Sequence, residues 1–183
     1  MRDLHSLLPV EGGRLRLRAL AEKDADAYAL GTKDPAVQEF AHLPKPDYTP
    51  QIVRDLAATV VVDGLRTGEL AVLTIADLAT DAFRGSLVLF DVGEHDAEVG
   101  FWLAPEARGR GLAREALSLA ARLASRAGLR ELRAVTAQEN TASARTLTAA
   151  GFTPVGEPGR MRAPSGAELT AQRYELRLAA ADV

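Results

Sequence analysis

The chain of 183 residues contains no cysteine, which excludes disulfide bridges, thiolate nucleophiles and cysteine-ligated zinc. Aromatic residues make up only 5% of it, too few for a platform on which nucleic-acid bases stack. The formal net charge of −3 gives no bulk attraction for DNA, RNA or an anionic membrane. No two of the histidines, His5, His42 and His95, have metal-ligand spacing. We therefore expect no metal and no nucleic acid as ligand.

Long apolar runs are also missing. Residues 56–62 form one of the longest, far short of the ~20 apolar residues that a membrane-spanning helix needs. The first residues carry an early acid, Asp3, and lack the apolar segment of a secretory signal peptide. We therefore expect a cytoplasmic protein that does not associate with a membrane.

The chain length and the lack of an internal repeat or low-complexity linker predict one domain over residues 1–183. Alternation of apolar and polar residues indicates strands, and apolar spacing of three to four indicates helices. Strands are expected at 14–19, 69–76, 86–92, 98–103, 132–136, 152–155 and 169–178. Helices are expected at 22–32, from Pro50 toward Gly64, at 109–127 and at 141–150, with Asp81 and Gly85 in a turn and a turn-rich loop at 158–166. This order of elements predicts an α+β (mixed α/β) domain.

The most informative segment is Arg108-Gly109-Arg110-Gly111-Leu112-Ala113, which opens the longest predicted helix. The first turn of a helix leaves backbone N–H groups unpaired at the positive end of the helix dipole. Glycines let a large anion approach that backbone, so the segment is typical of a phosphate or pyrophosphate cradle. Side-chain charge from Arg108 and Arg110 would add to it. The alternative is a strand-to-helix turn in which the glycines supply only flexibility.

Two nucleotide-binding motifs are excluded at this segment. A Walker P-loop ends in Gly-Lys followed by Ser or Thr, and the chain contains no Gly-Lys pair. A dinucleotide fingerprint requires a third glycine where this chain has Arg114, which is too bulky for close packing of helix and strand. The next predicted strand also ends at Thr136, where that fold places an acidic ribose ligand.

The pattern that remains resembles the GNAT superfamily of N-acetyltransferases. Their signature is Gln/Arg-x-x-Gly-x-Gly/Ala, which Arg108-x-x-Gly111-x-Ala113 meets. The segment Ala97-Glu98-Val99-Gly100-Phe101-Trp102-Leu103 is similar to the family's central strand. The segment Asn140-x-x-Ser143-x-Arg145-x-Leu147-x-x-x-Gly151-Phe152 resembles its second signature, most of all in the ribosomal-protein N-acetyltransferase branch. The resemblance implies a GNAT-like domain whose central, twisted, mostly antiparallel sheet is splayed at the CoA site and flanked by helices.

The resemblance implies acetyl-CoA as co-substrate. It assigns the CoA pyrophosphate to the backbone amides of one loop, namely Arg108, Gly109, Arg110, Gly111, Leu112 and Ala113. It assigns the pantetheine arm to the strand edge at Phe101, Trp102 and Leu103, where the arm pairs like an added strand. Asn140 contacts the cofactor, caps the following helix, or does both.

The implied chemistry is direct attack of a neutral amine on the thioester in a ternary complex. Glu98 is the candidate base that removes the amine proton; its alternative role is to pair with an arginine or to be solvated. Many family members place a tyrosine acid where this chain has Leu147. Ser143 is the substitute proton donor suggested by the branch, unless it serves only to hydrogen-bond at the helix start.

The sequence thus predicts an acyltransferase that acetylates a primary amine, either a peptide or protein N-terminal α-amine or a small-molecule amine. The acceptor is expected between residues 22–64 and the 158–166 loop. The alternative is a catalytically inactive acyl-CoA-binding module with a regulatory or interaction role. The residues leave open the acceptor's identity, the length of the acyl group and a homodimer through the final strands.

Overall fold

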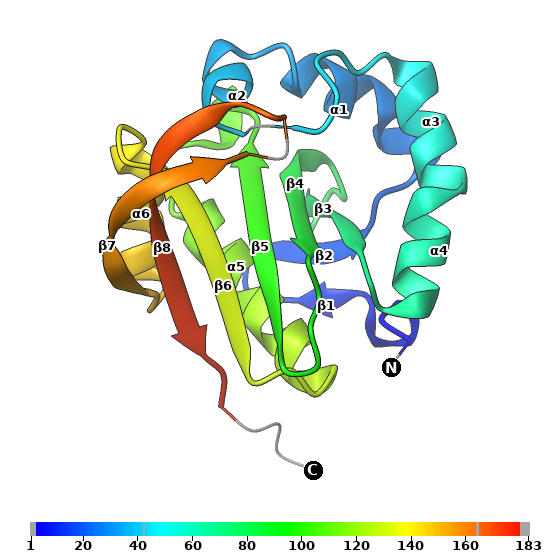
Figure 1. Ribbon diagram of the computed structural model, residues 1–183. Coiled ribbons are helices and arrows are strands. Elements are labelled where there is room, and N and C mark those ends of the chain that lie inside the picture. The colour runs from blue at the N-terminus through cyan, green and yellow to red at the C-terminus, as the bar shows by residue number, and fades with distance from the viewer. Residues whose placement is uncertain (1–2, 42, 164, 180–183) are drawn as a thin grey trace.

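An eight-stranded sheet organises the chain in this computed structural model, which describes residues 3–41, 43–163 and 165–179 (Figure 1). Its strand order is β1-β2-β3-β4-β5-β6-β8-β7, and every neighbouring pair is antiparallel except the parallel pair β5 and β6. The strands are β1 Val10–Glu11, β2 Leu15–Ala19, β3 Ala71–Asp77, β4 Phe83–Phe90, β5 Asp96–Leu103, β6 Glu131–Ala137, β7 Thr153–Arg162 and β8 Glu168–Arg177. The predicted α+β fold with a mostly antiparallel sheet is confirmed.

Six α-helices flank this sheet over the described residues. They are α1 Ala25–Gly31, α2 Pro35–Phe40, α3 Pro50–Ala58, α4 Val60–Thr67, α5 Leu112–Arg126 and α6 Thr141–Ala149. Short 3-10 turns lie at His5–Leu7, Glu22–Asp24 and Pro105–Ala107. Helix α5 lies behind the sheet in Figure 1, where it packs on β1, β2, β5 and β6, while α1 and α4 pack on β4 and β3.

Capping residues set several helix starts where the sequence predicted them. Thr49 Oγ1 accepts a hydrogen bond from the backbone N–H of Ile52 at 3.2 Å, with Pro50 at the first position of α3. The predicted single helix from Pro50 is in fact two, because the backbone leaves helical geometry at Thr59, between α3 and α4. Neither a proline nor a glycine marks that break in the sequence.

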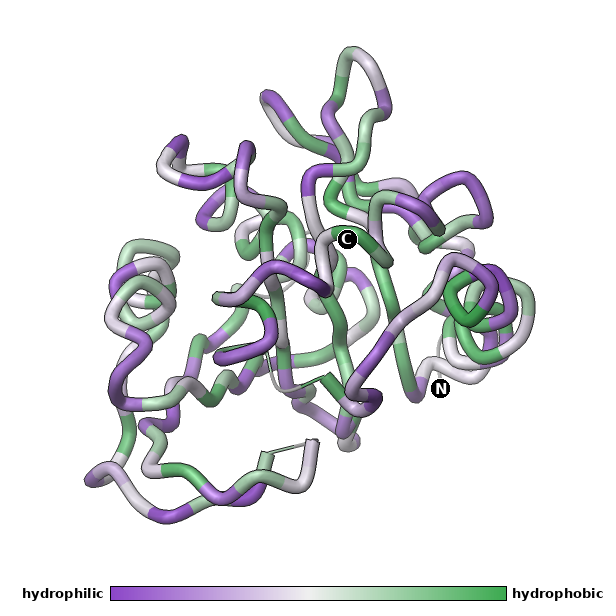
Figure 2. The backbone as a smooth tube through the Cα atoms, turned by 90° about the horizontal axis from the view of Figure 1, so that it is seen from above, coloured by the Kyte–Doolittle hydropathy of each residue, from purple (hydrophilic) through white to green (hydrophobic). Residues whose placement is uncertain are grey.

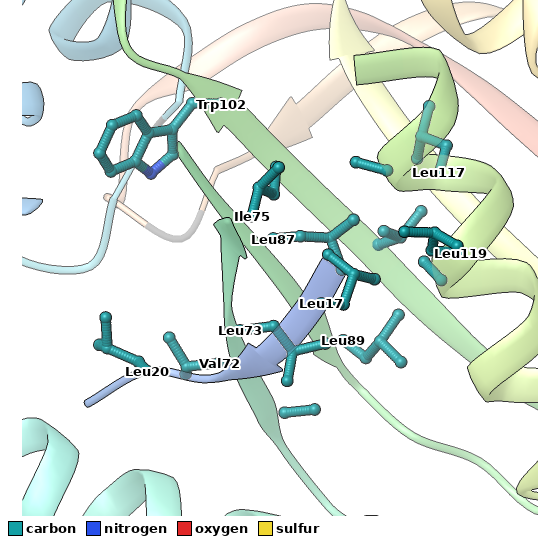
Figure 3. Packing of buried hydrophobic residues seen from close by; sticks show 14 of the residues in the cluster. Leu17, Leu20, Val72, Leu73, Ile75, Leu87, Leu89, Trp102, Leu117 and Leu119 are labelled. Atoms are coloured by element: carbon teal, nitrogen blue, oxygen red, sulfur yellow. The ribbon is translucent and has the colours of Figure 1, made fainter. Parts of the chain in front are cut away.

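The core lies on both faces of the sheet. Residues paired directly across neighbouring strands share a face, so Leu73, Leu87 and Phe101 lie in one row and Leu89 and Val99 in the next. Figure 3 shows Leu87 and Leu89 on the side of the sheet from which Leu117 and Leu119 of α5 approach. In Figure 2 the hydrophobic stretches run through the central strands and the hydrophilic ones concentrate in the outer turns.

Three further local features differ from the prediction. Helix α2 was not predicted, since the six residues between Asp34 and Ala41 are too few to show a helical period. Strand β7 continues to Arg162, although its prolines and glycines indicated a loop from residue 158. Gly85 lies inside β4, at the point where the β3–β4 register shifts, and is not a turn residue.

Both outer edges of the sheet are interrupted. Strand β1 has only two residues, and β7 contains Pro154 and Pro158, which have no backbone N–H to donate. The β7–β8 register also shifts between Val155 and Gly159. The Gln172 side-chain amide donates to the Val155 carbonyl at 3.0 Å within this bulge.

Candidate active site

The two parallel strands at the centre of the sheet separate after three paired positions. Asp96, Ala97 and Glu98 of β5 face Glu131, Leu132 and Arg133 of β6, and no pairing follows. A cleft of about 680 Å³ opens beyond this point. Its walls are β5 and β6, the 108–114 segment, the cleft-facing side of α6, and α2.

The walls of the cleft present unpaired strand backbone. Ala104 donates to the Arg84 carbonyl at 2.9 Å, which fixes the alternation of β5. By that alternation the N–H and C=O groups of Gly100 and Trp102 point toward β4, and those of Val99, Phe101 and Leu103 point into the cleft.

The opposite wall has the same character. Gln138 donates to the Thr170 carbonyl at 3.0 Å, so the even-numbered residues of β6 pair with β8. The backbone of Val135 therefore faces the cleft across from Val99 and Phe101. A ligand that carries amide groups can pair with both walls as an inserted strand.

The glycine segment forms a sharp turn at the mouth of this cleft. Gly109 and Gly111 have φ angles of +71° and +73°, which side-chain-bearing residues rarely adopt. Gly111 directly precedes α5, whose first N–H groups, at Leu112 and Ala113, have no partner within the helix. A β-carbon built on Gly109 meets no atom within 4 Å, so this side of the loop is open to a ligand.

Arg14, which the sequence did not single out, holds this turn in place. Its Nη1 donates to the Arg110 carbonyl at 2.9 Å, and its Nε donates to Glu115 Oε2 at 2.9 Å. The Arg14 backbone N–H donates to Glu115 Oε1 at 2.7 Å. The start of β2 is thereby tied to both the loop and the first turn of α5.

The Arg108 side chain makes protein contacts that the sequence did not predict. Its Nε and Nη2 donate to the Leu103 carbonyl at 3.1 and 2.9 Å, and Nη2 also donates to Asp34 Oδ1 at 2.5 Å. The hydrogen bond from Arg108 is the main reason why the pKa of Asp34 lies below its ordinary value. The Leu103 carbonyl is therefore already occupied, which leaves Phe101 as the predicted pantetheine contact with free backbone groups.

Trp102 lines the cleft but belongs to an aromatic cluster. Its ring lies 5.3 Å from that of Tyr28 and 5.6 Å from that of Phe83, and Tyr48 lies 5.5 Å from Tyr28. Its backbone pairs with Ser86 of β4. Trp102 thus shapes the cleft wall with its side chain, while its N–H and C=O groups are committed to the sheet.

Glu98 directly precedes the cleft-lining Val99 on β5 and is not itself part of the lining; it lies on the face of the sheet opposite to α5. It pairs with Phe90 and Arg133, in alternation with the α5-facing Val99. Its carboxylate has no ion pair or hydrogen bond with any residue that the structure describes. Burial raises the pKa of this carboxyl, and Asp91 raises it further, against the lowering effect of Arg133 and Arg173.

Asn140 and Ser143 lie on the other side of the cleft, at the start of α6. Asn140 Oδ1 accepts a hydrogen bond from the Ser143 backbone N–H at 3.1 Å and so caps the helix. Both residues line the cleft, and the Ser143 hydroxyl makes no hydrogen bond within the described part of the chain. Leu147, at the position of the family's tyrosine, is buried and offers no proton.

Sequence reasoning missed Arg14, Asp34, Val99 and Val135. The contact of Arg14 spans about a hundred residues of chain and that of Asp34 about seventy, and no local sequence pattern indicates either. Strand alternation could have identified Val99, since it shares the cleft-facing parity of Phe101.

No three histidine, aspartate or glutamate residues in ranges 3–41, 43–163 and 165–179 lie close enough together to hold a metal ion. His42 falls outside the described residues. Within the same ranges, no helix has the length and apolar character required to cross a membrane.

A family model described as acetyltransferase (GNAT) domain matches residues 14–153. No curated protein matches the chain. The chain is similar in structure to an acetyltransferase (GNAT family) from Bacillus anthracis, with a TM-score of 0.73 and 22% identity over 93% of this chain and 98% of that one. It is also similar to a ribosomal-protein-S5-alanine acetyltransferase from Vibrio fischeri (TM-score 0.77, 19% identity, 93% and 96% covered) and to a spermidine N-acetyltransferase from Vibrio cholerae in complex with CoA and spermine (0.74, 18%, 89% and 95%).

Proposed function

The chain belongs to the GNAT acetyltransferase family, and from that premise we propose that it transfers an acetyl group from acetyl-CoA to a primary amine. The observation that carries the proposal is the separation of β5 from β6 beside the glycine turn. One continuous cleft there offers N–H groups suited to a pyrophosphate and strand backbone suited to the amides of pantetheine. A strand-to-helix turn in which the glycines supply only flexibility would not require both the free N–H groups and the open strand backbone.

The residues fit CoA in a defined order along the cleft. The pyrophosphate is held by backbone N–H groups from Gly109 to Ala113, in a loop whose shape depends on Arg14. The pantetheine arm pairs with Phe101 and Val99 on one wall and approaches Val135 on the other. The Leu103 carbonyl, already bound by Arg108, is not part of this path.

The acceptor amine approaches from the face opposite to α5. Glu98 lies on that face, where α1 also lies, since Tyr28 of α1 contacts Trp102. Helix α6 packs against α5, so Ser143 is on the cofactor side. The candidate base and the candidate proton donor are therefore separated by the sheet, and the cleft between β5 and β6 connects them.

This arrangement supports a direct transfer. The amine nitrogen forms a bond to the thioester carbonyl carbon, the carbon–sulfur bond breaks, and the amine proton passes to Glu98, directly or through water. A backbone N–H of the cleft wall stabilises the charge on the carbonyl oxygen. The thiolate leaves with a proton supplied on the α6 side, for which Ser143 is the available hydroxyl.

A second cavity of about 330 Å³ supports the placement of the acceptor. It is lined by the end of α1, by α2, by the 43–48 loop and by the tip of the β7–β8 hairpin, through residues that include Thr32, Val37, Lys45, Tyr48 and Ser165. Val37 also lines the main cleft, so α2 separates the two spaces. We therefore place the acceptor, a peptide or protein N-terminal α-amine or a small amine, beside α2. A cytoplasmic reaction is part of the proposal, and the lack of cysteine is compatible with it.

The test is release of free CoA thiol from acetyl-CoA in the presence of an amine and peptide panel. A primary amine that raises thiol release, with one acetyl group added per thiol, supports the transferase. If acetyl-CoA raises the melting temperature but no acceptor is turned over, the protein is instead an acyl-CoA-binding module. If ADP or phosphate raises it as much as acetyl-CoA does, the CoA assignment itself is wrong.

A further inference from the structure

Helix α2 is a wall of the cleft with little anchoring of its own. Of its six residues only Val37 is buried. Ala36, Val37 and Phe40 nevertheless line the cleft, across from the 108–114 segment. A helix of this length is not stable by itself, so contacts at its ends decide how firmly the wall is held.

The N-terminal end of α2 is bound to the glycine loop by one side chain. Asp34 caps α2 by accepting the Val37 backbone N–H at 3.2 Å, and the same oxygen accepts from Arg108 Nη2. Arg108 in turn holds the Leu103 carbonyl at the end of β5. A single guanidinium therefore joins the cofactor strand, the cofactor loop and the wall beside the acceptor.

This junction is compatible with an occupied cofactor loop. The guanidinium has five N–H donors, and Asp34 and Leu103 use only those on Nε and Nη2. The Nη1 donors have no hydrogen bond with any described residue, and the Arg108 side chain is 37% exposed at the cleft. An anion in the loop can thus fix Arg108 without displacing Asp34, whose side chain is 15% exposed.

We propose that Asp34 is a positioning residue that acts through Arg108 to couple occupancy of the cofactor loop to the order of α2. Binding of CoA fixes the Arg108 backbone and guanidinium, and the ion pair then holds α2 against the cleft. By linkage, an ordered α2 strengthens CoA binding to the same degree. The cofactor thereby prepares the wall beside which the acceptor enters, a consequence that rests on the proposed function.

The test is hydrogen–deuterium exchange with CoA as the probe, which requires no acceptor. In the unaltered protein, CoA should slow amide exchange both in the 108–114 segment and in residues 35–41. Asp34→Asn keeps an oxygen that caps α2 about as well as aspartate, but removes the ion pair. In this variant, saturating CoA should slow amide exchange in the 108–114 segment but not in residues 35–41. Its Kd for CoA should rise about two- to fivefold, as expected for loss of a partly exposed ion pair.

Two further variants make the result specific. Asp63→Asn removes the same charge from the exposed Asp63–Arg66 pair and should behave like the unaltered protein. In an Arg108→Gln background, Asp34→Asn should change α2 exchange no further, because the coupling runs through Arg108. Protection of α2 that is equal in Asp34→Asn and the unaltered protein, or absent in both while the loop is protected, would overturn the coupling. Loss of loop protection in the unaltered protein would instead refute the CoA site.

Discussion

Glu98 and Arg133 are the last residues of β5 and β6 to face each other before the two parallel strands part. The carboxyl group therefore lies where the sheet stops being continuous and ligands from its two faces can meet. Arg133 does not form an ion pair with Glu98; it pairs with Asp91 and Asp96 at 3.1 and 3.4 Å. Glu98 is thus left available to a ligand.

Replacement of Glu98 by glutamine should lower kcat/KM at neutral pH by about 100-fold or more, the usual contribution of a general base. The loss should shrink at high pH, where the acceptor amine is already neutral. Because burial raises the Glu98 pKa, activity of the unaltered enzyme should fall with decreasing pH before the ordinary glutamate value is reached. Glu175→Gln, across from Arg133 on β8, is the control. A pH-independent loss would exclude Glu98 as the base.

Gly111→Val should weaken CoA binding by about five- to thirtyfold, as measured by calorimetry. At φ +73° a side chain costs ~1–2 kcal/mol, so the loop must change shape to relieve the strain. The nearest atom to an added β-carbon is Arg14 Nη2 at 3.8 Å, which means that backbone strain and not a clash is the cause. Gly159→Ala, at an exposed site with no atom within 4 Å, should leave affinity unchanged. Unaltered affinity in Gly111→Val would remove the loop from the binding site.

Arg14→Met should weaken CoA binding about threefold or more, since the charged hydrogen-bond donor to the Arg110 carbonyl is lost. Arg122→Met is a matched control, because Arg122 Nη1 also donates to a backbone carbonyl, that of Glu11, from the middle of α5. Arg14→Met also loses the ion pair with Glu115, so it should be the less stable variant, and only Arg14→Met should lose CoA affinity. Equal affinities in the two would show that Arg14 has no role in shaping the loop.

Asp24→Ala should reduce the free energy of unfolding by about 3–5 kcal/mol in a denaturant titration, as for a broken buried ion pair. Asp24 is 3% exposed, and its carboxylate accepts from Arg18 at 2.7 and 2.8 Å and from Thr74 Oγ1 at 2.8 Å. Arginine stays protonated in proteins, so Asp24→Ala leaves the Arg18 cation with only the more exposed Asp81 as ion-pair partner, at 2.9 Å. Asp63→Ala, which breaks a pair exposed by 68% and 72%, should cost less than about 1 kcal/mol. Similar losses of unfolding free energy in Asp24→Ala and Asp63→Ala would contradict the distinction between the buried and the exposed ion pair.

The turn between β3 and β4 should confer acid sensitivity. Asp77 accepts from the Thr80 N–H and hydroxyl, both at 3.0 Å, and from Arg84 at 3.2 Å, which together lower its pKa to about 2. A carboxylate with a lowered pKa stabilises the fold above its ordinary value of 3.8, and this contribution is lost as the pH falls toward 2. The melting-temperature gap between the unaltered protein and Asp77→Asn should therefore narrow over that range. A melting-temperature gap that stays constant from pH 3.8 toward 2 would contradict this role of Asp77. Thr80→Ala should shift the loss of the Asp77 contribution to higher pH.

The sequence predicted the fold best where local chemistry decides structure. Alternation located the central strands to within a few residues, and the caps at Thr49 and Asn140 start helices as expected. The α3–α4 break was missed because neither a proline nor a glycine marks it. Helix α2 was missed because a tertiary contact holds its start: it depends on Asp34 and its long-range partner Arg108. Local pattern carries no information on such pairs.

The candidate site was predicted in outline and incompletely in detail. Motif spacing identified the loop, the strand and the start of α6, which the fold brings together around one cleft. It could not show that the Arg108 guanidinium turns toward Leu103, or which of the two alternating sets of β5 residues has its backbone on the cleft. Those facts depend on hydrogen-bond parity across strands that are distant in sequence.

The interrupted edges of the sheet have a further consequence for self-association. Exposed strand edges recruit further strands from other molecules, and proteins limit this with prolines, bulges and short strands. Here β1 is two residues long and β7 carries Pro154, Pro158 and the bulge filled by Gln172. Unpaired strand backbone also lies inside the sheet, in the cleft beyond the last paired position of β5 and β6. The unpaired backbone of β5 and β6 thus lies in a cleft that a small ligand can enter and a sheet of another molecule cannot, which limits self-association through strand pairing.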